Sequence, residues 1–494
     1  MQNRIVIKII PIFLIAIALF FGTYKLTESP PTWYDEGIIL QPAINLALIG
    51  KMVVQVAPES VISPQFISVG YPVIYPISFV FKYFGIGLLQ ARVVMVVFIM
   101  LLACVFFLFA QEIFGFKYAS LSTLLLVSFA PLYGNGKNVL GEIPGLFFLI
   151  LFLYCVNKIE KNFSNTFYYI AAGISAGLCV VTKPLFLILL PAIFVTALLL
   201  RKRIEFRWKL ILLSLVSFFI PFFVWLQTQF QKGDSSHNAL GDTFSHAINY
   251  YINPYQVQDL FGIIVTNFVR FFTEISPAYF FILFIIWTIS ILIRAITKNK
   301  SISIAETVAF CFSCLLIGAY LRTAGWYRYF FPANILVFLF IPAAIETISN
   351  FLREKIAILN KICIIKHLPI VVIVFFAVVH FYQLGFNSWV ANYYHSTRTK
   401  DLSSYFENSD FDGEKSIFVY DSPELILFLN NRNYYQYMEL TDTFIIGNDQ
   451  KKLIKKGIPD NIIIKSNVLE ENKDSLYLYQ AKDRFDQYTL LERK

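Results

Sequence analysis

The chain has 494 residues, of which 57% are hydrophobic and only 15% are charged. Soluble globular proteins carry about 25% charged residues, and the mean hydropathy here is +0.63. This composition excludes an ordinary soluble domain and predicts an integral membrane protein, because each span needs roughly 20 mostly apolar residues. The formal net charge of +9 does not indicate nucleic-acid binding. The basic residues lie in short segments between apolar runs, where they orient a membrane protein.

About eleven apolar runs along the chain predict membrane-spanning helices. The first run lacks a small-residue cleavage site, so we expect it to be a retained span rather than a signal peptide. A further run at 70–89 is interrupted by Pro72, Pro76 and Lys82, and we expect a helix that lies at the outer membrane interface. The predicted spans cover residues 5–22, 90–112, 118–134, 143–157, 167–182, 184–200, 209–228, 277–295, 303–321, 328–348 and 368–386.

The basic residues orient these spans. If 70–89 does not span, Lys and Arg concentrate in alternate loops, most strongly in "RKRIEFRWK" at 201–209. Positive charge favours the cytoplasmic side. The sequence therefore predicts a multi-pass protein of the cell membrane, plasma or inner, with a cytoplasmic N-terminus and an extracytoplasmic C-terminus. Residues 23–89 and 229–276 then form large outer loops, and the first of them carries interfacial helices.

Residues 387–494 differ from the rest because they are polar and charged. "SPELILFLNN" predicts a helix with Ser422 as N-cap and Pro423 in its first turn. The pattern predicts a transmembrane domain over 1–386 and a small extracytoplasmic α/β domain over 387–494, in which no catalytic constellation is visible. Its β-like runs are "SIFVYD" at 416–421, "NIIIKS" at 461–466 and "YTLLER" at 488–493.

Acidic residues stand at the outer ends of two predicted spans. Asp35 and Glu36 follow the first span in "TWYDEGII", and Glu142 opens the fourth in "GEIPGLFF". Acids in the first turn of a helix complement its dipole, and an interfacial helix over 35–50 would explain the first two structurally. An ionisable group at membrane depth is costly and usually faces a cavity or a partner. A functional site is therefore the competing interpretation, since carboxylates suit base chemistry on a hydroxyl.

Cationic residues stand on the same predicted side of the membrane. Lys183 separates two apolar helices in "VVTKPLFLI", and Arg322 and Arg328 lie among aromatic rings in "LRTAGWYRYFFP". Snorkelling would explain the lysine, and the aromatic belt of membrane proteins would explain the rings. Neither explains two arginines on the side where positive charge is disfavoured, whereas arginine binds phosphate bidentately and lysine binds it as a point charge. Together with the acids, they predict a site for a phosphate on an apolar tail, that is, a lipid-linked donor.

The order of these motifs resembles the GT-C superfamily of membrane glycosyltransferases. The similar branch is that of the protein O-mannosyltransferase-like and lipid A aminoarabinose transferase-like enzymes. The resemblance implies transfer of a sugar from a polyprenyl-phosphate donor to the hydroxyl of a glycan, lipid or protein acceptor on the extracytoplasmic face. It further implies one in-line displacement that inverts the anomeric centre. The matching pieces, over roughly residues 1–348, are "WYDEG", "GYPVIYP", "LLQARVV", "FAQEIFGFKYA", "GEIPGLFF", "AAGISAGLCVVTKP" and "YRYFFPANILVF".

The resemblance also implies roles for single residues. Asp35 is similar to the catalytic acid of the family, which takes the proton from the acceptor hydroxyl. Glu142 resembles the acid of the second outer loop, which orients the acceptor or the base. Lys183 and Arg328 match positions that would hold the donor phosphate, and Arg92 is a further candidate for that role.

A divalent metal is left open by the resemblance. Some relatives bind one near the first loop with acidic residues, and Glu36 is available here for a metal or for the acceptor. No His or further acid stands in "GYPVIYPIS", where the aminoarabinose branch carries a Glu-Lys pair. The sugar, the acceptor, the role of the C-terminal domain and the oligomeric state are equally open.

Three alternatives compete with a glycosyltransferase of this kind. A polytopic transporter or flippase of a lipid-linked or polar substrate predicts internal repeats, helices broken at mid-membrane depth and charges in mid-span. The sequence has no clear repeat, and its charged residues lie towards one face. A catalytically inactive scaffold that works through residues 387–494, and a polymerase or ligase of lipid-linked glycans, are the other two.

Overall fold

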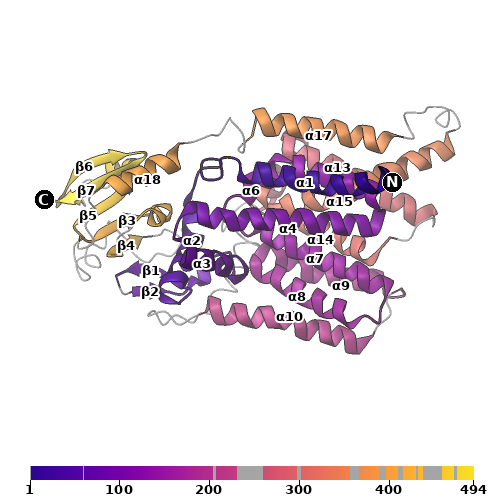
Figure 1. Cartoon of the computed structure of the whole chain (residues 1–494), viewed down its shortest axis with the longest axis horizontal. Coiled ribbons are helices and arrows are strands. Elements are labelled where there is room, and N and C mark those ends of the chain that lie inside the picture. The colour runs from indigo at the N-terminus through magenta and orange to yellow at the C-terminus, as the bar shows by residue number, and fades with distance from the viewer. Residues whose placement is uncertain are drawn as a thin grey trace.

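The computed structural model describes residues 2–58, 60–203, 207–230, 260–297, 302–356, 367–388, 397–409, 415–429, 432–437, 459–471 and 476–494. The molecule is elongated (Figure 1). A bundle of helices forms most of it, and a five-stranded sheet lies at the end away from the N-terminus.

Helices cover all the predicted spans, which confirms a polytopic helical membrane protein. Six are long and apolar enough to cross a membrane: α4 (Leu88–Phe114), α7 (Glu142–Lys161), α10 (Trp208–Gln229), α13 (Ile275–Thr297), α15 (Phe331–Lys355) and α17 (Leu368–Phe386). The other predicted spans correspond to α1 (Gln2–Thr23), α5 (Phe116–Ser128) with α6 (Ala130–Gly136), α8 (Thr166–Thr182), the 3-10 turn η2 (Pro184–Ile188) with α9 (Leu189–Leu199), and α14 (Ile304–Tyr320).

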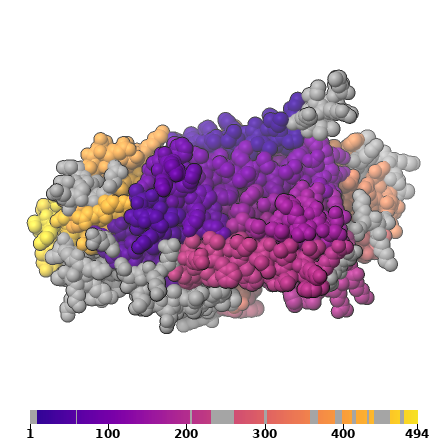
Figure 2. Space-filling view, turned by 60° about the horizontal axis from the view of Figure 1, so that its bottom comes forward, coloured from indigo at the N-terminus to yellow at the C-terminus, as the bar shows by residue number. Residues whose placement is uncertain are grey.

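The helices differ in how much apolar surface they expose. α15 is central, since every residue from Phe331 to Pro342 is buried, and Phe340 stacks on Trp287 of α13 with ring centroids 4.6 Å apart. α10 lies along one flank, which Figure 2 shows in pink. Its large apolar side chains are exposed, as expected of a helix that faces lipid: Leu212, Leu215, Val216, Ile220 and Phe223.

The segment that the sequence predicts as the first outer loop contains only short elements among its described residues. α2 (Tyr34–Ile49) confirms the helix expected over 35–50, and α3 (Tyr71–Phe84) confirms that 70–89 holds a helix too short to span. Fourteen helical residues rise about 21 Å, whereas the hydrocarbon core is about 30 Å thick. Between the two helices lie a hairpin, β1 (Val54–Ala57) with β2 (Ser60–Ile62), and the 3-10 turn η1 (Pro64–Phe66).

One helix in the predicted second outer loop was not expected from the sequence. α12 (Leu260–Thr273) buries Asn267, whose amide donates a hydrogen bond to the carbonyl of Thr323 at 2.7 Å. Arg270 donates to the carbonyl of Gly325 at 2.6 Å. α12 thereby holds the segment that precedes Arg328. Residues 231–259 of this loop lie outside the described residues.

The C-terminal domain is built on a mixed sheet with the strand order β4-β3-β5-β7-β6. β3 is parallel to β4 and β5, whereas β7 is antiparallel to β5 and β6. β3, β5 and β7 match the three predicted β-like runs, and the small α/β domain is confirmed. The boundary after residue 386 stays a prediction, although α17 ends there. The strands are β3 (Ile417–Tyr420), β4 (Tyr434–Tyr437), β5 (Asn461–Lys465), β6 (Tyr479–Phe485) and β7 (Tyr488–Arg493).

Helices accompany this sheet, and one of them corrects the sequence analysis. α18 (Arg398–Asn408) and α20 (Ser466–Glu471) are helical, but "SPELILFLNN" forms only the 3-10 turn η5 (Pro423–Leu427). Ser422 does occupy the N-cap position of η5, and Pro423 lies in the first turn, as predicted, but the Ser422 hydroxyl donates to the carbonyl of Tyr420 at 3.1 Å instead of capping the turn. η5 is buried and packs against α2, so tertiary contacts rather than helix propensity decide its conformation.

Candidate active site

Five helix ends meet beside the C-terminal domain. α2, α4 and α7 begin there, α8 ends there, and the 3-10 turn η3 (Tyr327–Tyr329) leads into α15. Ion pairs between these ends show that they are neighbours: Arg92 with Glu36, Lys183 with Glu142, and Arg328 with Asp35. Helix N-termini carry unpaired N–H groups and a positive dipole end, so this arrangement favours an anion.

Asp35 and Arg328 form a partly exposed ion pair. The Arg328 Nη1 atom lies 2.8 Å from the Asp35 Oδ2 atom, and the two side chains are 13% and 33% exposed. The guanidinium lies between rings, 5.4 Å from the ring centre of Trp33 and 4.6 Å from that of Trp326. Its Nε atom is buried and has no hydrogen-bond partner among the described residues. Burial lowers the pKa of Arg328, but Glu142 and Asp35 outweigh burial and hold the pKa above its usual value.

Glu142 and Lys183 form a second, buried ion pair. The Lys183 Nζ atom lies 2.5 Å from the Glu142 Oε1 atom, and the side chains are 7% and 1% exposed. Glu142 is the first residue of α7, and Lys183 caps α8 in an extended conformation, which the following Pro184 favours. The Glu142 Oε2 atom is buried, and no described residue donates a hydrogen bond to it. A buried carboxylate oxygen without a donor is an open acceptor, and ligand hydroxyls are among the groups that satisfy such atoms.

The two pairs belong to one electrostatic cluster, which we call the catalytic cluster: Asp35, Glu142, Lys183 and Arg328. Lys183 interacts with Arg328 and Asp35 as well as with Glu142, and Arg328 interacts with Glu142 as well as with Asp35. The structure thus brings together four of the six residues that the sequence nominated. Their individual roles stay predictions.

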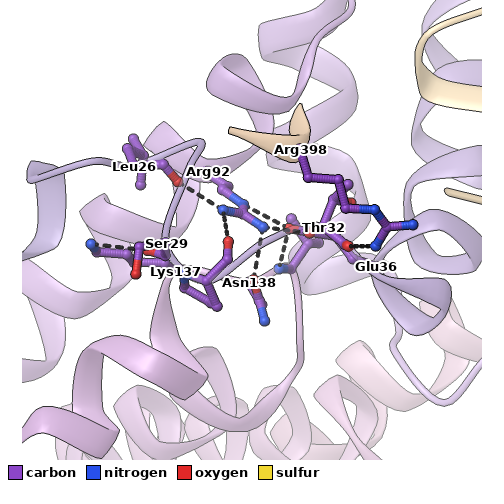
Figure 3. A network of polar contacts seen from close by, with 10 residues as sticks. Leu26, Ser29, Thr32, Glu36, Arg92, Lys137, Asn138 and Arg398 are labelled. Atoms are coloured by element: carbon purple, nitrogen blue, oxygen red, sulfur yellow. Dashed lines mark hydrogen bonds and ion pairs between the residues drawn. The ribbon is translucent and has the colours of Figure 1, made fainter. Parts of the chain in front are cut away.

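The other two nominated residues, Glu36 and Arg92, form a separate network (Figure 3). Both side chains are fully buried and bind each other through two hydrogen bonds of 2.9 and 2.7 Å. Arg92 also donates to the carbonyls of Leu26 and Pro30 and to the Asn138 amide oxygen. These contacts use all five N–H groups of a guanidinium.

The predicted roles of Glu36 and Arg92 do not fit this arrangement. Arg92 has no free donor for a phosphate. The Glu36 Oε1 atom accepts a further hydrogen bond from the backbone N–H of Val139 at 3.1 Å, and its side chain is not accessible to a metal or an acceptor. The adjacency of two acids in "WYDEG" did not reveal that Asp35 faces the cluster and Glu36 the interior.

Lys137 is a buried residue that the sequence analysis did not single out. Its Nζ atom donates to the carbonyls of Tyr24 and Ser29, at 2.5 and 3.2 Å. Burial, and then the nearby Arg92, lower the pKa of Lys137 to about 7. Lys137 and Arg92 therefore fix the segment between α1 and α2 from the inside.

The residues present do not fit a resident metal ion. Within the described residues no group of three His, Cys, Asp or Glu side chains is placed to hold one. In the catalytic cluster each carboxylate is paired with a cation, which competes with a metal for the same oxygens. A cavity of about 290 Å³ lies at the other end of α4, lined by Arg294, Glu306 and Glu346 among others. It is remote from the cluster and plays no part in the site.

The sequence matches a known protein family over part of its length. A family profile described as dolichyl-phosphate-mannose-protein mannosyltransferase matches residues 71–226. This segment contains Arg92, Glu142 and Lys183, whereas Asp35 and Arg328 lie outside it. No curated protein matches the sequence significantly.

Solved structures resemble nearly the whole chain. ArnT from Cupriavidus metallidurans in the apo state is 13% identical, with a TM-score of 0.67 and 97% of each chain covered. The same protein bound to undecaprenyl phosphate gives 14% identity, a TM-score of 0.66 and the same coverage. The oligosaccharyltransferase AglB from Archaeoglobus fulgidus, in complex with an inhibitory peptide and a dolichol-phosphate, is 14% identical with a TM-score of 0.59. That match covers 95% of this chain and 70% of AglB. The GT-C fold expected from the sequence is confirmed.

Proposed function

We propose that the protein is a membrane glycosyltransferase, which moves a sugar from a polyprenyl-phosphate donor to an acceptor hydroxyl and inverts the anomeric centre. The observation that carries the proposal is the catalytic cluster: two acids and two cations from four separate segments, gathered where helices begin. The fold agrees with this function, because ArnT and AglB, which share it, were solved with undecaprenyl phosphate and with a dolichol-phosphate.

Arg328 and Lys183 are proposed to hold the donor phosphate. The Arg328 Nε atom supplies a donor that none of the described protein groups uses, and Lys183 adds a compact charge 2.5 Å from Glu142. Without substrate the cluster holds two acids and two cations and is electrically balanced. A bound phosphodiester competes with the carboxylates for the cations, and this weakens the pairs that hold Asp35 and Glu142 in the free protein.

Asp35 and Glu142 are proposed to handle the acceptor. Asp35 is the more exposed acid, with a third of its side chain accessible, and it serves as the general base. Glu142 keeps one oxygen unpaired, which can accept a hydrogen bond and orient the acceptor or the base. A general base must lie within hydrogen-bond reach of the proton that it removes, and a hydroxyl bound between the two acids satisfies this condition.

The reaction is one displacement. The acceptor oxygen attacks the anomeric carbon, and a carbon–oxygen bond forms there as the bond to the phosphate oxygen breaks. The proton of the hydroxyl passes to Asp35 and is later released to water. The leaving polyprenyl phosphate gains negative charge, which Arg328 and Lys183 stabilise. Attack from the face opposite the phosphate inverts the configuration.

Glu36 and Arg92 are proposed to support the site rather than to contact the substrate. Their network joins α2 to α4 and to the loop before α7, so it fixes where Asp35 and Glu142 stand. The proposed membrane sidedness rests on loop charge: the site would face the extracytoplasmic side of the plasma or inner membrane. The proposal includes hexoses and pentoses as the transferred sugar and a glycan, lipid or protein as the acceptor.

A reconstituted assay tests the proposal. The purified full chain in nanodiscs is incubated with a panel of radiolabelled polyprenyl-phosphate hexoses and pentoses and with membrane glycolipids or peptides as acceptors. We expect release of polyprenyl phosphate with one donor, a product of inverted configuration, and loss of turnover in Asp35→Asn. Lys482→Ala, an exposed residue at the edge of the C-terminal sheet, is the control. Undiminished transfer by Asp35→Asn would remove Asp35 from the role of base.

The same preparation separates the alternatives. A transporter or flippase would move a fluorescent lipid-linked sugar across a liposome membrane without consuming it. A scaffold would neither move nor consume it, and either result would contradict the transferase.

A further inference from the structure

The C-terminal domain contacts the first turn of α2, which carries Asp35. η5 packs against α2, and the two backbones approach closely at Gly37. A Cβ atom at this position would overlap the backbone nitrogen and Cα atom of Glu424 and the carbonyl carbon of Pro423. Only glycine fits there without moving one of the two backbones. Gly37 lies two residues after Asp35.

A second contact reaches the backbone three residues before Asp35. Arg398, the first residue of α18, donates from Nη1 to the carbonyl of Thr32 at 3.2 Å. Figure 3 shows Arg398 reaching this segment beside the Glu36–Arg92 pair. The same guanidinium is fixed within the C-terminal domain, because it also donates to Asp486 at 2.6 Å and to the Tyr488 hydroxyl at 2.9 Å.

The group that holds Arg398 also holds η5. The Tyr488 hydroxyl donates to the Glu424 Oε1 atom at 2.6 Å, and Glu424 is 3% exposed. One hydrogen-bonded unit of the C-terminal domain, which we call the clamp, therefore touches residues 32 and 37. It consists of Arg398, Glu424 and Tyr488.

Asp35 lies between the two points of contact, and its partner Arg328 belongs to the helical bundle. A shift of the C-terminal domain would therefore move Asp35 relative to Arg328, Glu142 and Lys183, which have no contact of their own with the clamp among the hydrogen bonds and ion pairs of the described residues. A displacement of about 1 Å can reduce a rate about a hundredfold when it spoils the attack geometry.

We propose that the C-terminal domain positions the catalytic base, with Arg398 and Gly37 as the positioning residues. The inference rests on the proposed function only in so far as Asp35 is the base. It gives the domain a role in turnover rather than in binding the donor, because the clamp touches the helix of the acid and not the residues proposed for the phosphate.

The test compares four variants of the full chain: Gly37→Ala, Arg398→Ala, Arg398→Lys and the control Gly318→Ala. An added Cβ at Gly318 meets nothing within 4 Å. We expect kcat to fall about 10- to 100-fold in Gly37→Ala and Arg398→Ala, while the KM for the donor and the affinity for polyprenyl phosphate stay within about twofold. Arg398→Lys retains a donor for the Thr32 carbonyl and should recover part of the lost kcat. Gly318→Ala should match wild type.

Two results overturn the proposal. One is wild-type kcat in both Gly37→Ala and Arg398→Ala. The other is a parallel loss of thermal stability, donor affinity and kcat, without recovery in Arg398→Lys, which is what a purely structural role predicts.

A measurement that does not depend on turnover makes the test of the clamp independent of the test of the proposed activity. Hydrogen exchange, followed by mass spectrometry, reports the opening of the backbone amides of residues 33–38. We expect faster exchange there in Arg398→Ala and wild-type exchange in α4 and α7. If the wild type transfers no sugar, the proposed function fails, yet unchanged exchange at 33–38 would separately refute the clamp.

Discussion

Two charged clusters lie side by side at the same end of the bundle and differ in how completely their hydrogen bonds are satisfied. In the Glu36–Arg92 network the guanidinium uses all its donors and the carboxylate is fully buried. In the catalytic cluster the Glu142 Oε2 and Arg328 Nε atoms are buried and lack partners within the part of the chain that the structure describes, and Asp35 is partly exposed. Buried charged groups whose hydrogen bonds are all satisfied stabilise a structure, whereas donor and acceptor atoms that are not satisfied are available to a ligand. The adjacent acids Asp35 and Glu36 therefore differ in role: Glu36 stabilises the structure, and Asp35 is available to a ligand.

The largest effect is expected on turnover, from a substitution in the catalytic cluster. Asp35→Asn keeps the size of the side chain and removes its basicity, so we expect kcat to fall about 10²- to 10⁴-fold, the usual contribution of a positioned base. The melting temperature should change little, because Asp35 is partly exposed. Steady-state kinetics together with a thermal melt measures both. A large loss of stability in Asp35→Asn would indicate that Asp35 has a structural role like that of the Glu36–Arg92 network.

The next largest effect is expected on the stability of the fold, through the Glu36–Arg92 network. Arg92→Met leaves Glu36 buried without a counter-charge, and breaking one side of a buried pair costs about 3–5 kcal/mol. We expect a clearly lower melting temperature and low yields of folded protein, measured by differential scanning fluorimetry in detergent. The double variant Glu36→Gln with Arg92→Met removes both charges and should recover part of the loss. Wild-type stability of Arg92→Met would contradict the distinction between the two clusters.

A smaller effect is expected on donor affinity. Arg328→Lys keeps the charge but loses the planar guanidinium with its unpaired Nε, and hydrogen bonds to charged groups contribute about 1.5–3 kcal/mol each. We expect polyprenyl phosphate to bind about tenfold more weakly, as measured by microscale thermophoresis. Lys482→Ala serves again as the control, and equal affinity in both variants would exclude Arg328 from the phosphate site.

The smallest effect concerns Lys137 and pH. Its pKa is lowered from 10.5 to about 7 in the folded protein, so between about pH 7 and pH 10.5 the unfolded chain binds more protons at this group. Its contribution to stability must then rise with pH across that window and stay flat below it. The melting temperature of wild type minus that of Lys137→Met should therefore increase from pH 7 to pH 9. A flat difference would show that Lys137 stays protonated in the folded state.

The sequence predicted the fold well wherever hydrophobicity decides it. All the apolar runs became helices, and the Pro-interrupted run at 70–89 became a short one. It failed where tertiary contacts decide: "SPELILFLNN" is a 3-10 turn because η5 is wedged against α2, and α12 was overlooked because an amphipathic helix of 14 residues resembles neither a span nor a polar loop.

The sequence predicted which residues belong to the candidate site, but it did not predict how they pair or which of them are buried. Charges at the ends of apolar runs identified Asp35, Glu142, Lys183 and Arg328 together with Glu36 and Arg92. Which acid pairs with which cation depends on the angle at which each helix enters the site, and a linear motif does not encode that angle. Gly37 was visible in "WYDEG", yet its significance needs η5, which follows almost 400 residues later.

That sequence separation has a consequence for biosynthesis. β7 follows all the membrane helices among the described residues, and its first residue, Tyr488, completes the hold on Arg398 and Glu424. A nascent chain can therefore insert all its helices and assemble every charged group of its reaction centre while still on the ribosome. It acquires this anchor for Asp35 only when translation has passed β7, so competence for the proposed sugar transfer should arise after those helices have inserted.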